Sequence, residues 1–352
     1  MFPKKRIYNK VIILIAFCVI SVFVIPISFY FFKIFQSSKN HSLQQREINI
    51  YSHRGFNLQN KKKNWLVYPA NQSSSIINSL KTYNGVEFDL HEVNSTNRKK
   101  EIVLLHNDHL DLYSFPKVHF SNYYYKESNP PKLNLNYTVR SLEESFQVQP
   151  IKIQRLIDKD ENYSLGKLQT FVNLYKKLKN KKTTFWELKT GGKKAFRLYK
   201  TSLPFKVSKT ILDNNLAKNS VVISFYWWVP IKSKIAALSK GKYLLTGIDV
   251  VDQYVTEQYV YFAKILGYDF FMPPHDQVNL KILQACKKVD LKLVSWSRGT
   301  IKDEDRSLKT LLNLYFSLST NERPSLGLIV NQNEKHIKRL INRTKQLSTK
   351  RT

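Results

Sequence analysis

Histidine and carboxylate side chains gather between residues 51 and 110, in or at the ends of short apolar segments. The first segment, INIYSHRG, ends in His53 and Arg54. The second, GVEFDLHE, carries Glu87 and Asp89, which share a face because side chains alternate along a strand. The third, EIVLLHND, brings His106 to the end of an apolar run typical of a strand buried on both sides. We therefore expect these groups at the carboxyl ends of consecutive parallel strands, where α/β proteins place their chemistry.

A third carboxylate, Glu187, lies in the later apolar segment TTFWELK. Together with Glu87 and Asp89 it suits a hard divalent cation, Mg²⁺ or Ca²⁺, with water and phosphate as the remaining ligands. The alternative is a set of surface acids in ordinary salt bridges. Acids flanked by Val, Phe and Trp in buried strands rarely lack a partner, so the sequence favours a metal site.

The order of these motifs resembles that of the glycerophosphodiester phosphodiesterases, a family of the phospholipase-C-like phosphodiesterase superfamily with a TIM-barrel fold. The motifs that carry the resemblance are His53-Arg54-Gly55, Pro69-Ala70-Asn71-Gln72, Glu87-Phe88-Asp89, His106 and Glu187-Leu188-Lys189. The matching region runs from about residue 48 to about residue 332. The resemblance implies an α/β fold, a TIM-type (β/α)8 barrel, and hydrolysis of a glycerophosphodiester or a lysophospholipid headgroup.

The resemblance also implies a role for each candidate residue. His53 and His106 would be the general acid and base, one activating the attacking oxygen and the other protonating the leaving alkoxide. Arg54 and Lys189 would bind phosphate oxygens, and the three carboxylates would hold the cation. Trp296, in the segment VSWSR, would line the mouth of the barrel, although ordinary core packing explains it equally well.

Three positions depart from the pattern of the family. Ala70 stands where glutamate is usual, His106-Asn107-Asp108 replaces a histidine-aspartate pair, and Val330-Asn331-Gln332 replaces a threonine-aspartate ending. The histidines and acids of the main motifs are nevertheless present. We therefore favour an enzyme, and the alternative is a catalytically weak barrel that acts as a binding or scaffold domain.

Segments of strand and helix character alternate from residue 165 onward, as in a mainly parallel sheet. Nine strand candidates compete for eight barrel places, so one of them is expected outside the barrel. Residues 111 to 163 have no regular period and are expected to form an inserted cap. The chain has 352 residues, enough for a barrel of about 250 residues with appendages. Its two cysteines support neither a disulfide framework nor a thiolate metal site.

The N-terminal residues predict a single-pass membrane anchor. Residues 11 to 32 carry no charge and can span a hydrocarbon layer of about 30 Å. We expect a basic cytoplasmic segment over residues 1–10, a transmembrane signal anchor over 11–35, a stalk over 36–47 and an extracytoplasmic barrel over 48–332. The alternative, a cleaved signal peptide, is disfavoured because its apolar region is typically only about 7 to 15 residues long.

The formal net charge of +31, from 57 basic and 26 acidic residues, is spread along the chain. Nucleic acid is the first partner that such a balance suggests. No recognition motif accompanies the charge, and an anchor argues against a nucleic-acid role, so we expect an anionic lipid surface as the partner. A compositional bias of the genome would explain the charge equally well. Residues 333–352 are expected to form a basic C-terminal tail.

Overall fold

The structure, a computed structural model, describes residues 48–55, 71, 73–94, 100–104, 166–189, 202–252, 254–298 and 301–349. The predicted anchor, the stalk, the region 111–163 and His106 lie outside these residues. Within the described ranges, no helix has both the length and the apolar character needed to cross a membrane.

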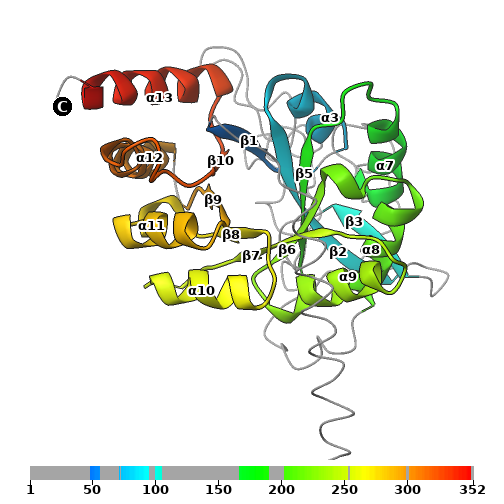
Figure 1. Cartoon of the computed structure of the whole chain (residues 1–352). Coiled ribbons are helices and arrows are strands. Elements are labelled where there is room, and N and C mark those ends of the chain that lie inside the picture. The colour runs from blue at the N-terminus through cyan, green and yellow to red at the C-terminus, as the bar shows by residue number, and fades with distance from the viewer. Residues whose placement is uncertain are drawn as a thin grey trace, which may run out of the picture. The chain divides into compact units, whose positions relative to one another are not determined.

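Eight parallel strands close into a barrel (Figure 1). They are β1 (Asn49–His53), β2 (Gly85–Asn94), β5 (Thr183–Leu188), β6 (Ser220–Ser224), β7 (Leu245–Asp249), β8 (Phe270–Met272), β9 (Lys292–Trp296) and β10 (Leu326–Val330). Strand β1 pairs with both β10 and β2, and this double pairing closes the ring. The predicted TIM-type barrel is therefore confirmed.

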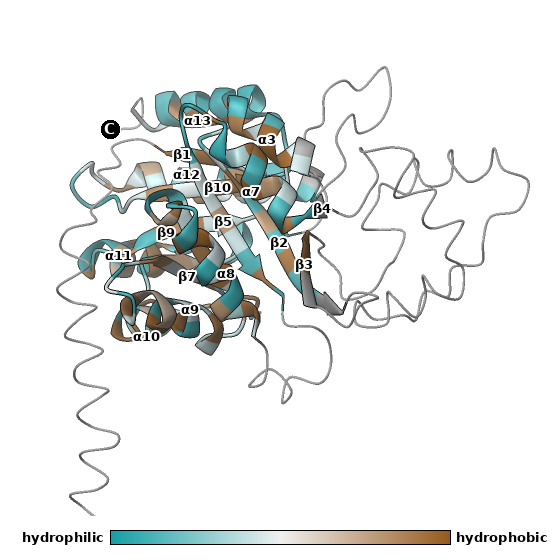
Figure 2. Ribbon diagram, turned by 90° about the vertical axis from the view of Figure 1, so that its right-hand side faces the viewer, coloured by the Kyte–Doolittle hydropathy of each residue, from teal (hydrophilic) through white to brown (hydrophobic). Residues whose placement is uncertain are grey.

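Helices surround the strands on the outside of the ring (Figure 1). They are α3 (Ser73–Thr82), α7 (Leu168–Lys176), α8 (Leu203–Asp213), α9 (Trp228–Leu238), α10 (Glu257–Ile265), α11 (Leu280–Lys288), α12 (Ile301–Ser317) and α13 (Glu334–Thr349). Each packs an apolar stripe against the sheet; in α12 this stripe includes the fully buried Leu308, Leu311 and Leu312. The helices accordingly carry both apolar and polar residues, as Figure 2 shows.

The inside of the barrel is a packed apolar core rather than a pore. It consists of Tyr51, Phe185, Val221, Ile223, Leu245, Phe270, Met272, Val294 and Ile329. Two strand glycines make room for the ring of Tyr51: a Cβ at Gly327 would lie 2.6 Å from that ring, and a Cβ at Gly85 would lie 2.9 Å from it. Large side chains inside the barrel thus alternate with positions where the backbone must come close.

The third apolar segment, EIVLLHND, was wrongly predicted to be a parallel barrel strand. Its first half is β3 (Lys100–Leu104), which runs antiparallel to the second half of β2, with Leu90 opposite Leu104. The short strand β4 (Gly166–Lys167) pairs with β3 on its other side. Only residues 95–99 join β2 to β3, and a parallel connection needs a crossover of a dozen or more residues. This segment is the ninth strand candidate, the one expected outside the barrel.

Two other segments differ from their predicted form. The predicted strand SVVISFYWW ends at Ser224, and its four aromatic residues lead into α9. Residues 333–352, expected to form a tail, contain α13, whose Ile337 and Leu340 are buried. Both segments carry apolar side chains that have a packing partner in the barrel.

Candidate active site

The three predicted carboxylates meet at the carboxyl ends of two neighbouring strands. Glu87 and Asp89 lie on β2, and Glu187 lies on β5 directly opposite Asp89 in the ladder. One oxygen from each lies within 4.8 Å of the other two. All three side chains are buried, with exposed fractions of 3%, 0% and 6% for Glu87, Asp89 and Glu187. Burial of three acids in one place is costly unless cations or protons neutralise them.

Two basic side chains reach into this carboxylate cluster. The Nζ atom of Lys189 lies 3.1 Å from Asp89 Oδ1 and forms an ion pair with Glu187. The Nε atom of Arg54 lies 3.2 Å from Asp89 Oδ2. Burial alone would lower the pKa of Lys189, but the charges of Glu187 and Asp89 outweigh that effect and raise it. Lys189 therefore remains protonated throughout the neutral range.

The acids themselves are harder to ionise than free carboxyl groups. Burial raises the pKa of Glu87 well above its usual value, and the charge of Asp89 adds to the effect. Burial likewise raises the pKa of Glu187, although Lys189 opposes it. Both groups would release a proton more readily if another positive charge were bound between them.

The carboxylate cluster has the ligand chemistry of a divalent-cation site. All the available donors are carboxylate oxygens, the ligands that Mg²⁺ and Ca²⁺ prefer. The Oε1 atom of Glu87 is buried and has no hydrogen-bond partner among the described residues. A cation bound by Glu87, Asp89 and Glu187 would satisfy this orphaned atom, so the residues fit the predicted metal.

His53 stands at the end of β1 beside the carboxylate cluster. Its Nε2 atom lies 3.7 Å from Glu87 Oε2, and its Nδ1 atom lies 2.7 Å from Asn331 Oδ1. An amide oxygen can only accept a hydrogen bond, so in this arrangement Nδ1 carries the proton and Nε2 is left to face the cluster. The histidine is thus held in the tautomer that can accept a proton at Nε2.

A tight turn after β1 brings Arg54 to the same place. Arg54 and Gly55 both have positive φ angles, of 58° and 70°. A Cβ at Gly55 would lie 2.7 Å from the backbone nitrogen of Ile76, so only glycine fits there. The Arg54 N–H donates to the backbone oxygen of Glu87 at 2.8 Å, which fixes the turn against β2.

Asn71 is a site residue to which the sequence analysis assigned no role. Its Nδ2 group donates to Asp89 Oδ2 at 2.8 Å, and its Oδ1 atom accepts from the Asp89 N–H at 3.0 Å. These two bonds orient the Asp89 carboxylate. The motif that carries Asn71 was recognised, but a role for the amide could be assigned only once its distance to Asp89 was known.

Asp249 is a second such residue, placed at the end of β7 and buried. Its pKa is raised to about 7, chiefly by burial, with Lys189 lowering it and Asp89 raising it further. In the sequence it is the single acid of an apolar strand, GIDV, and such an isolated acid was the available signal. Asp249 brings a further ionisable group near the carboxylate cluster.

Aromatic rings form one wall of this end of the barrel. The ring centroid of Phe225 lies 4.9 Å from Lys189 Nζ and 5.9 Å from the ring of Trp296. Trp296 donates from Nε1 to the backbone oxygen of Met272 at 3.0 Å, and the guanidinium of Arg298 lies over its ring. Trp296 therefore lies on the same side of the barrel as the carboxylate cluster.

His275 lies apart from the carboxylate cluster, in a short 3₁₀ helix (His275–Gln277) that packs against α12. Its Nδ1 atom lies 2.8 Å from Ser295 Oγ. Burial lowers its pKa to about 3, so it stays neutral. His275 therefore belongs to the packing between the barrel and its helices. His106 falls outside the described residues, and its position relative to His53 stays a prediction.

Comparison with known proteins identifies the fold. No protein-family model and no curated protein sequence matches the chain. A glycerophosphoryl diester phosphodiesterase structure from Silicibacter pomeroyi is 13% identical, with a TM-score of 0.59, covering 84% of this chain and 94% of that one. A glycerophosphodiester phosphodiesterase structure from Galdieria sulphuraria is 15% identical, with a TM-score of 0.56, covering 85% and 98%. At these identities the likeness establishes the fold: the chain has the eight-stranded parallel barrel of structures named as glycerophosphodiester phosphodiesterases.

Proposed function

We propose that the protein is a membrane-anchored, metal-dependent phosphodiesterase that hydrolyses a glycerophosphodiester or a lysophospholipid headgroup. The observation that carries the proposal is the meeting of three buried carboxylates with a histidine and two bases at one end of the barrel. Arranged in this way, the residues offer a cation site, a proton acceptor and two phosphate ligands. The fold shared with the phosphodiesterase structures supports the same reading.

Glu87, Asp89 and Glu187 would hold Mg²⁺ or Ca²⁺. When bound, such a cation neutralises charge on the phosphate oxygens as the leaving oxygen departs. Asn71 would keep the Asp89 carboxylate in its orientation through the two hydrogen bonds described above. Such support around a ligand typically affects metal affinity or activity by about 10- to 100-fold.

His53 would move the proton at the attacking oxygen. Its Nε2 atom faces the carboxylate cluster, and Asn331 holds the proton on Nδ1. An imidazole titrates near neutral pH and so can both accept and return a proton. His106 would protonate the leaving alkoxide, a role that rests on the family resemblance alone.

Arg54 and Lys189 would bind the phosphate oxygens. Both now contact Asp89, and a cation that takes over the charge of this acid would free them to turn to the substrate. Their charges stabilise the developing negative charge on the phosphate, a major source of rate in such reactions. Phe225 and Trp296 would form the apolar wall beside them.

The test is the turnover of glycerophosphocholine and lysophosphatidylcholine by the purified full-length protein, with and without Mg²⁺ or Ca²⁺. We expect metal-dependent release of choline from both substrates, with glycerol 3-phosphate as the second product of glycerophosphocholine and lysophosphatidic acid as that of lysophosphatidylcholine. Loss of this activity in Glu87→Gln, with the activity kept in Asp276→Asn, a change at an exposed position of the 3₁₀ helix, would support the site. Absence of turnover with every divalent metal and both substrates would favour the alternative, a binding or scaffold domain.

The anchor is tested separately from the chemistry. The uncharged run at residues 11 to 32 supports membrane insertion, with the barrel on the extracytoplasmic side. The full-length protein should resist alkaline carbonate extraction, and protease added to the extracytoplasmic side should digest the barrel. Recovery of a soluble protein trimmed at its N-terminus would identify a cleaved signal peptide instead.

A further inference from the structure

The barrel has a strongly basic surface at the amino-terminal ends of its strands, opposite the candidate active site. All eight strands are parallel, so every segment that leads from a helix into the next barrel strand ends on this side. Taken with up to two residues of the flanking helix or strand, these segments are residues 81–84, 176–182, 213–219, 238–244, 264–269, 287–292 and 318–325. Together they contain fourteen Lys and Arg residues and four Asp and Glu residues. We call this surface the amino-terminal face.

Three of the four acids on the amino-terminal face are already engaged. Asp269 binds the buried ammonium group of Lys234 at 2.9 Å. Asp213 lies 3.7 Å from Lys240, and Glu322 accepts hydrogen bonds from the serine three residues before it. These acids therefore leave most of the positive charge of the face uncompensated.

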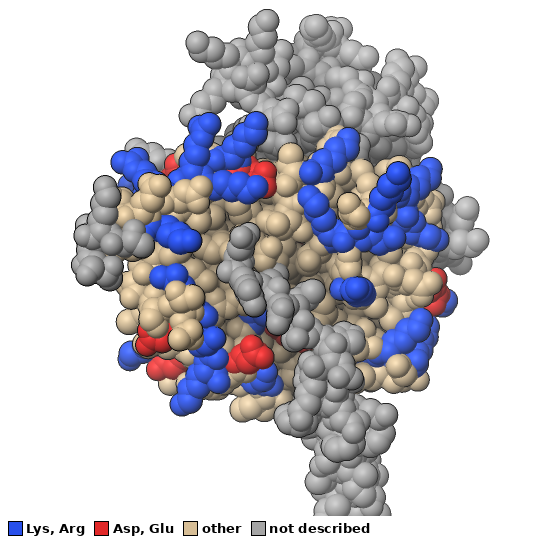
Figure 3. All heavy atoms as spheres, turned by 45° about the horizontal axis from the view of Figure 1, so that its top comes forward, with Lys and Arg blue, Asp and Glu red and all other residues tan. Residues whose placement is uncertain are grey.

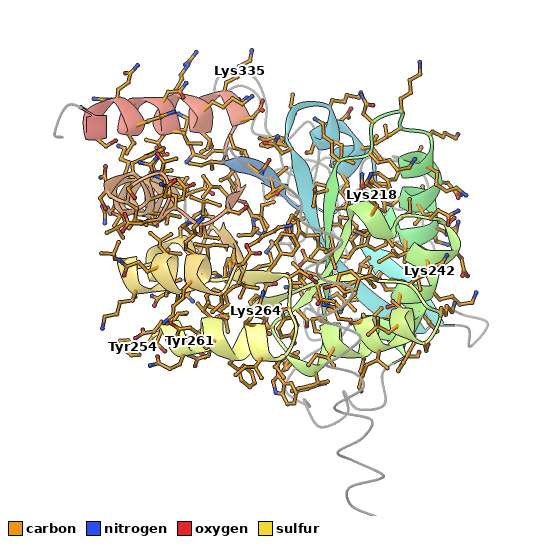
Figure 4. All side chains as sticks on the ribbon, viewed as in Figure 1. Lys218, Lys242, Tyr254, Tyr261, Lys264 and Lys335 are labelled. Carbon is orange, nitrogen blue, oxygen red and sulfur yellow. The ribbon has the colours of Figure 1, made fainter. Side chains whose placement is uncertain are left out.

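Many of the bases point to solvent. Residues 176–182 hold five lysines in seven positions, and Lys177, Lys179 and Lys181 are exposed without an acidic partner among the described residues. Lys218 and Lys242, labelled in Figure 4, extend the charge to two further segments. The excess of basic over acidic side chains is visible on the face of the molecule drawn in Figure 3.

The predicted anchor joins the barrel at this same face. Strand β1 begins at Asn49, and its first residue lies with the first residues of the other barrel strands. Residues 33–47 connect that point to the uncharged run at 11–32. Fifteen residues span at most about 50 Å when fully extended, so a bilayer that held the run would stay near the barrel.

We infer that the amino-terminal face binds the anionic headgroups of a lipid bilayer, which leaves the mouth of the barrel pointing away from that bilayer. Charge complementarity calls for an anionic partner, and the attachment point of the predicted anchor favours a bilayer over nucleic acid as that partner. The attraction extends over about 8 Å at physiological ionic strength, the Debye length, so it acts once the anchor has brought the face to the membrane.

This orientation bears on the substrate, a consequence that rests on the proposed function. With the carboxylate cluster at the far end of the barrel, a phosphodiester would have to arrive from the aqueous phase. A water-soluble glycerophosphodiester meets that condition, whereas a lysophospholipid held in the same bilayer does not. The inference therefore selects between the two substrate classes that the chemistry alone leaves open.

The orientation can be measured by energy transfer from a fluorophore on the barrel to an acceptor dye on lipid headgroups. The full-length protein, with Cys18 replaced by Ser, would carry one label at Asn321→Cys on the amino-terminal face or at Tyr254→Cys, which is 82% exposed near the opposite end. We expect stronger transfer from position 321 than from 254. Adding about 30% phosphatidylserine to phosphatidylcholine vesicles should strengthen it, and about 0.5 M NaCl should reverse that gain.

Charge-reversal variants test which part of the surface is responsible for the response to phosphatidylserine. Lys179→Glu combined with Lys181→Glu should abolish most of the increase in energy transfer that phosphatidylserine produces. The matched control is Lys281→Glu with Arg306→Glu, which makes the same charge change in the first turn of α11 and the second turn of α12, toward the opposite end of the barrel. This variant should keep the phosphatidylserine-dependent increase in energy transfer. The inference would be overturned by stronger energy transfer from position 254 than from 321, or by transfer that does not respond to phosphatidylserine. It would also be overturned if both charge-reversal variants lost the phosphatidylserine response equally, or if the protein bound duplex DNA more tightly than anionic vesicles.

The outcome is independent of catalysis because energy transfer is measured without substrate. Turnover of glycerophosphocholine by the detergent-solubilised protein tests the proposed function by itself. In anionic vesicles we expect soluble glycerophosphocholine to be cleaved at least ten times faster than lysophosphatidylcholine embedded in the same membrane. Faster cleavage of the embedded lysolipid would overturn the orientation while leaving the phosphodiesterase in place.

Discussion

Asn331 and His53, separated by 278 positions in the sequence, are joined by a contact of 2.7 Å between Oδ1 and Nδ1. The backbone N–H of Asn331 in turn donates to Oε1 of the buried Glu304 at 2.9 Å. Glu304, at the start of α12, thus holds Asn331 in place at the end of β10, and the side-chain amide of Asn331 in turn orients the ring of His53. The asparagine that departs from the usual threonine-aspartate ending has a defined structural partner in the candidate site.

Replacing Asn331 should reduce turnover without weakening the metal site. Asn331→Leu removes the acceptor for the Nδ1 proton, so His53 can rotate or change tautomer, and we expect kcat to fall about 10- to 100-fold. KM and the affinity for the divalent cation should change little. Steady-state kinetics and metal titration measure these effects, and ¹⁵N chemical shifts of the imidazole report the tautomer directly.

Asn331→Asp provides the matched comparison because a carboxylate oxygen also accepts from Nδ1. It should retain most of the activity that Asn331→Leu loses. An Asn331→Leu variant with unchanged kcat, or one whose His53 keeps its proton on Nδ1, would contradict the positioning role.

Asn71 should support the metal site through Asp89. Asn71→Ala removes both hydrogen bonds to Asp89, and leaving a buried acceptor without its donor costs about 1 to 3 kcal/mol. We expect the affinity for the divalent cation to fall about 10-fold or more. Isothermal titration of the purified protein with Mg²⁺ or Ca²⁺ measures it. Asn313→Ala, at an exposed position of α12, is the control and should bind metal normally.

Local patterns in the sequence were sufficient to predict the carboxylate pair. The period of two along a strand predicted that Glu87 and Asp89 share a face. Their proximity to Glu187 depends on β2 and β5 being neighbours in register, which local sequence does not specify and which the family order supplied. The contacts of Asn71, Asp249 and Asn331 form only in the closed barrel. The amino-acid types of these residues were therefore not sufficient to predict a role for them.

The misassigned strand shows where the sequence pattern was ambiguous. An apolar run such as 101–105 is expected both for a barrel strand and for any strand covered by a helix. Here β3 packs beneath α7, where Val103 and Leu104 are buried. The short polar connection before it, residues 95–99, was the decisive signal, because it is too short for a parallel crossover.

Asp249 should make the metal-free protein less stable as the pH rises. Its pKa is about 7 in the folded state, against an ordinary value of 3.8, so between these values the folded state binds the extra proton. Stability therefore falls from about pH 4 to about pH 7 and is level above that. A difference of this size corresponds to at most about 4 kcal/mol.

Asp249→Asn should consequently stabilise the protein in EDTA at pH 8 and have little effect at pH 4. Thermal unfolding at both pH values measures this, with the exposed Asp276→Asn as the control. Divalent cations should raise the Tm of the unmodified protein more at pH 8 than at pH 5, because bound carboxylates must be deprotonated. Equal stabilisation by Asp249→Asn at pH 4 and pH 8 would show that burial does not hold the proton on this group.

The separation between proton transfer and metal binding gives the sharpest test of the proposed mechanism. His53→Ala and His106→Ala should each lose about 10² to 10⁴ in rate, because a positioned proton donor or acceptor is gone, while the affinity for the cation stays near normal. Glu87→Gln removes one charged ligand, so added Mg²⁺ or Ca²⁺ should restore part of its lost rate. Activity measured against metal concentration distinguishes the two classes, since no excess of cation can supply a missing proton donor. Near-normal activity in both histidine variants, or rescue of either by metal, would remove the histidines from the mechanism.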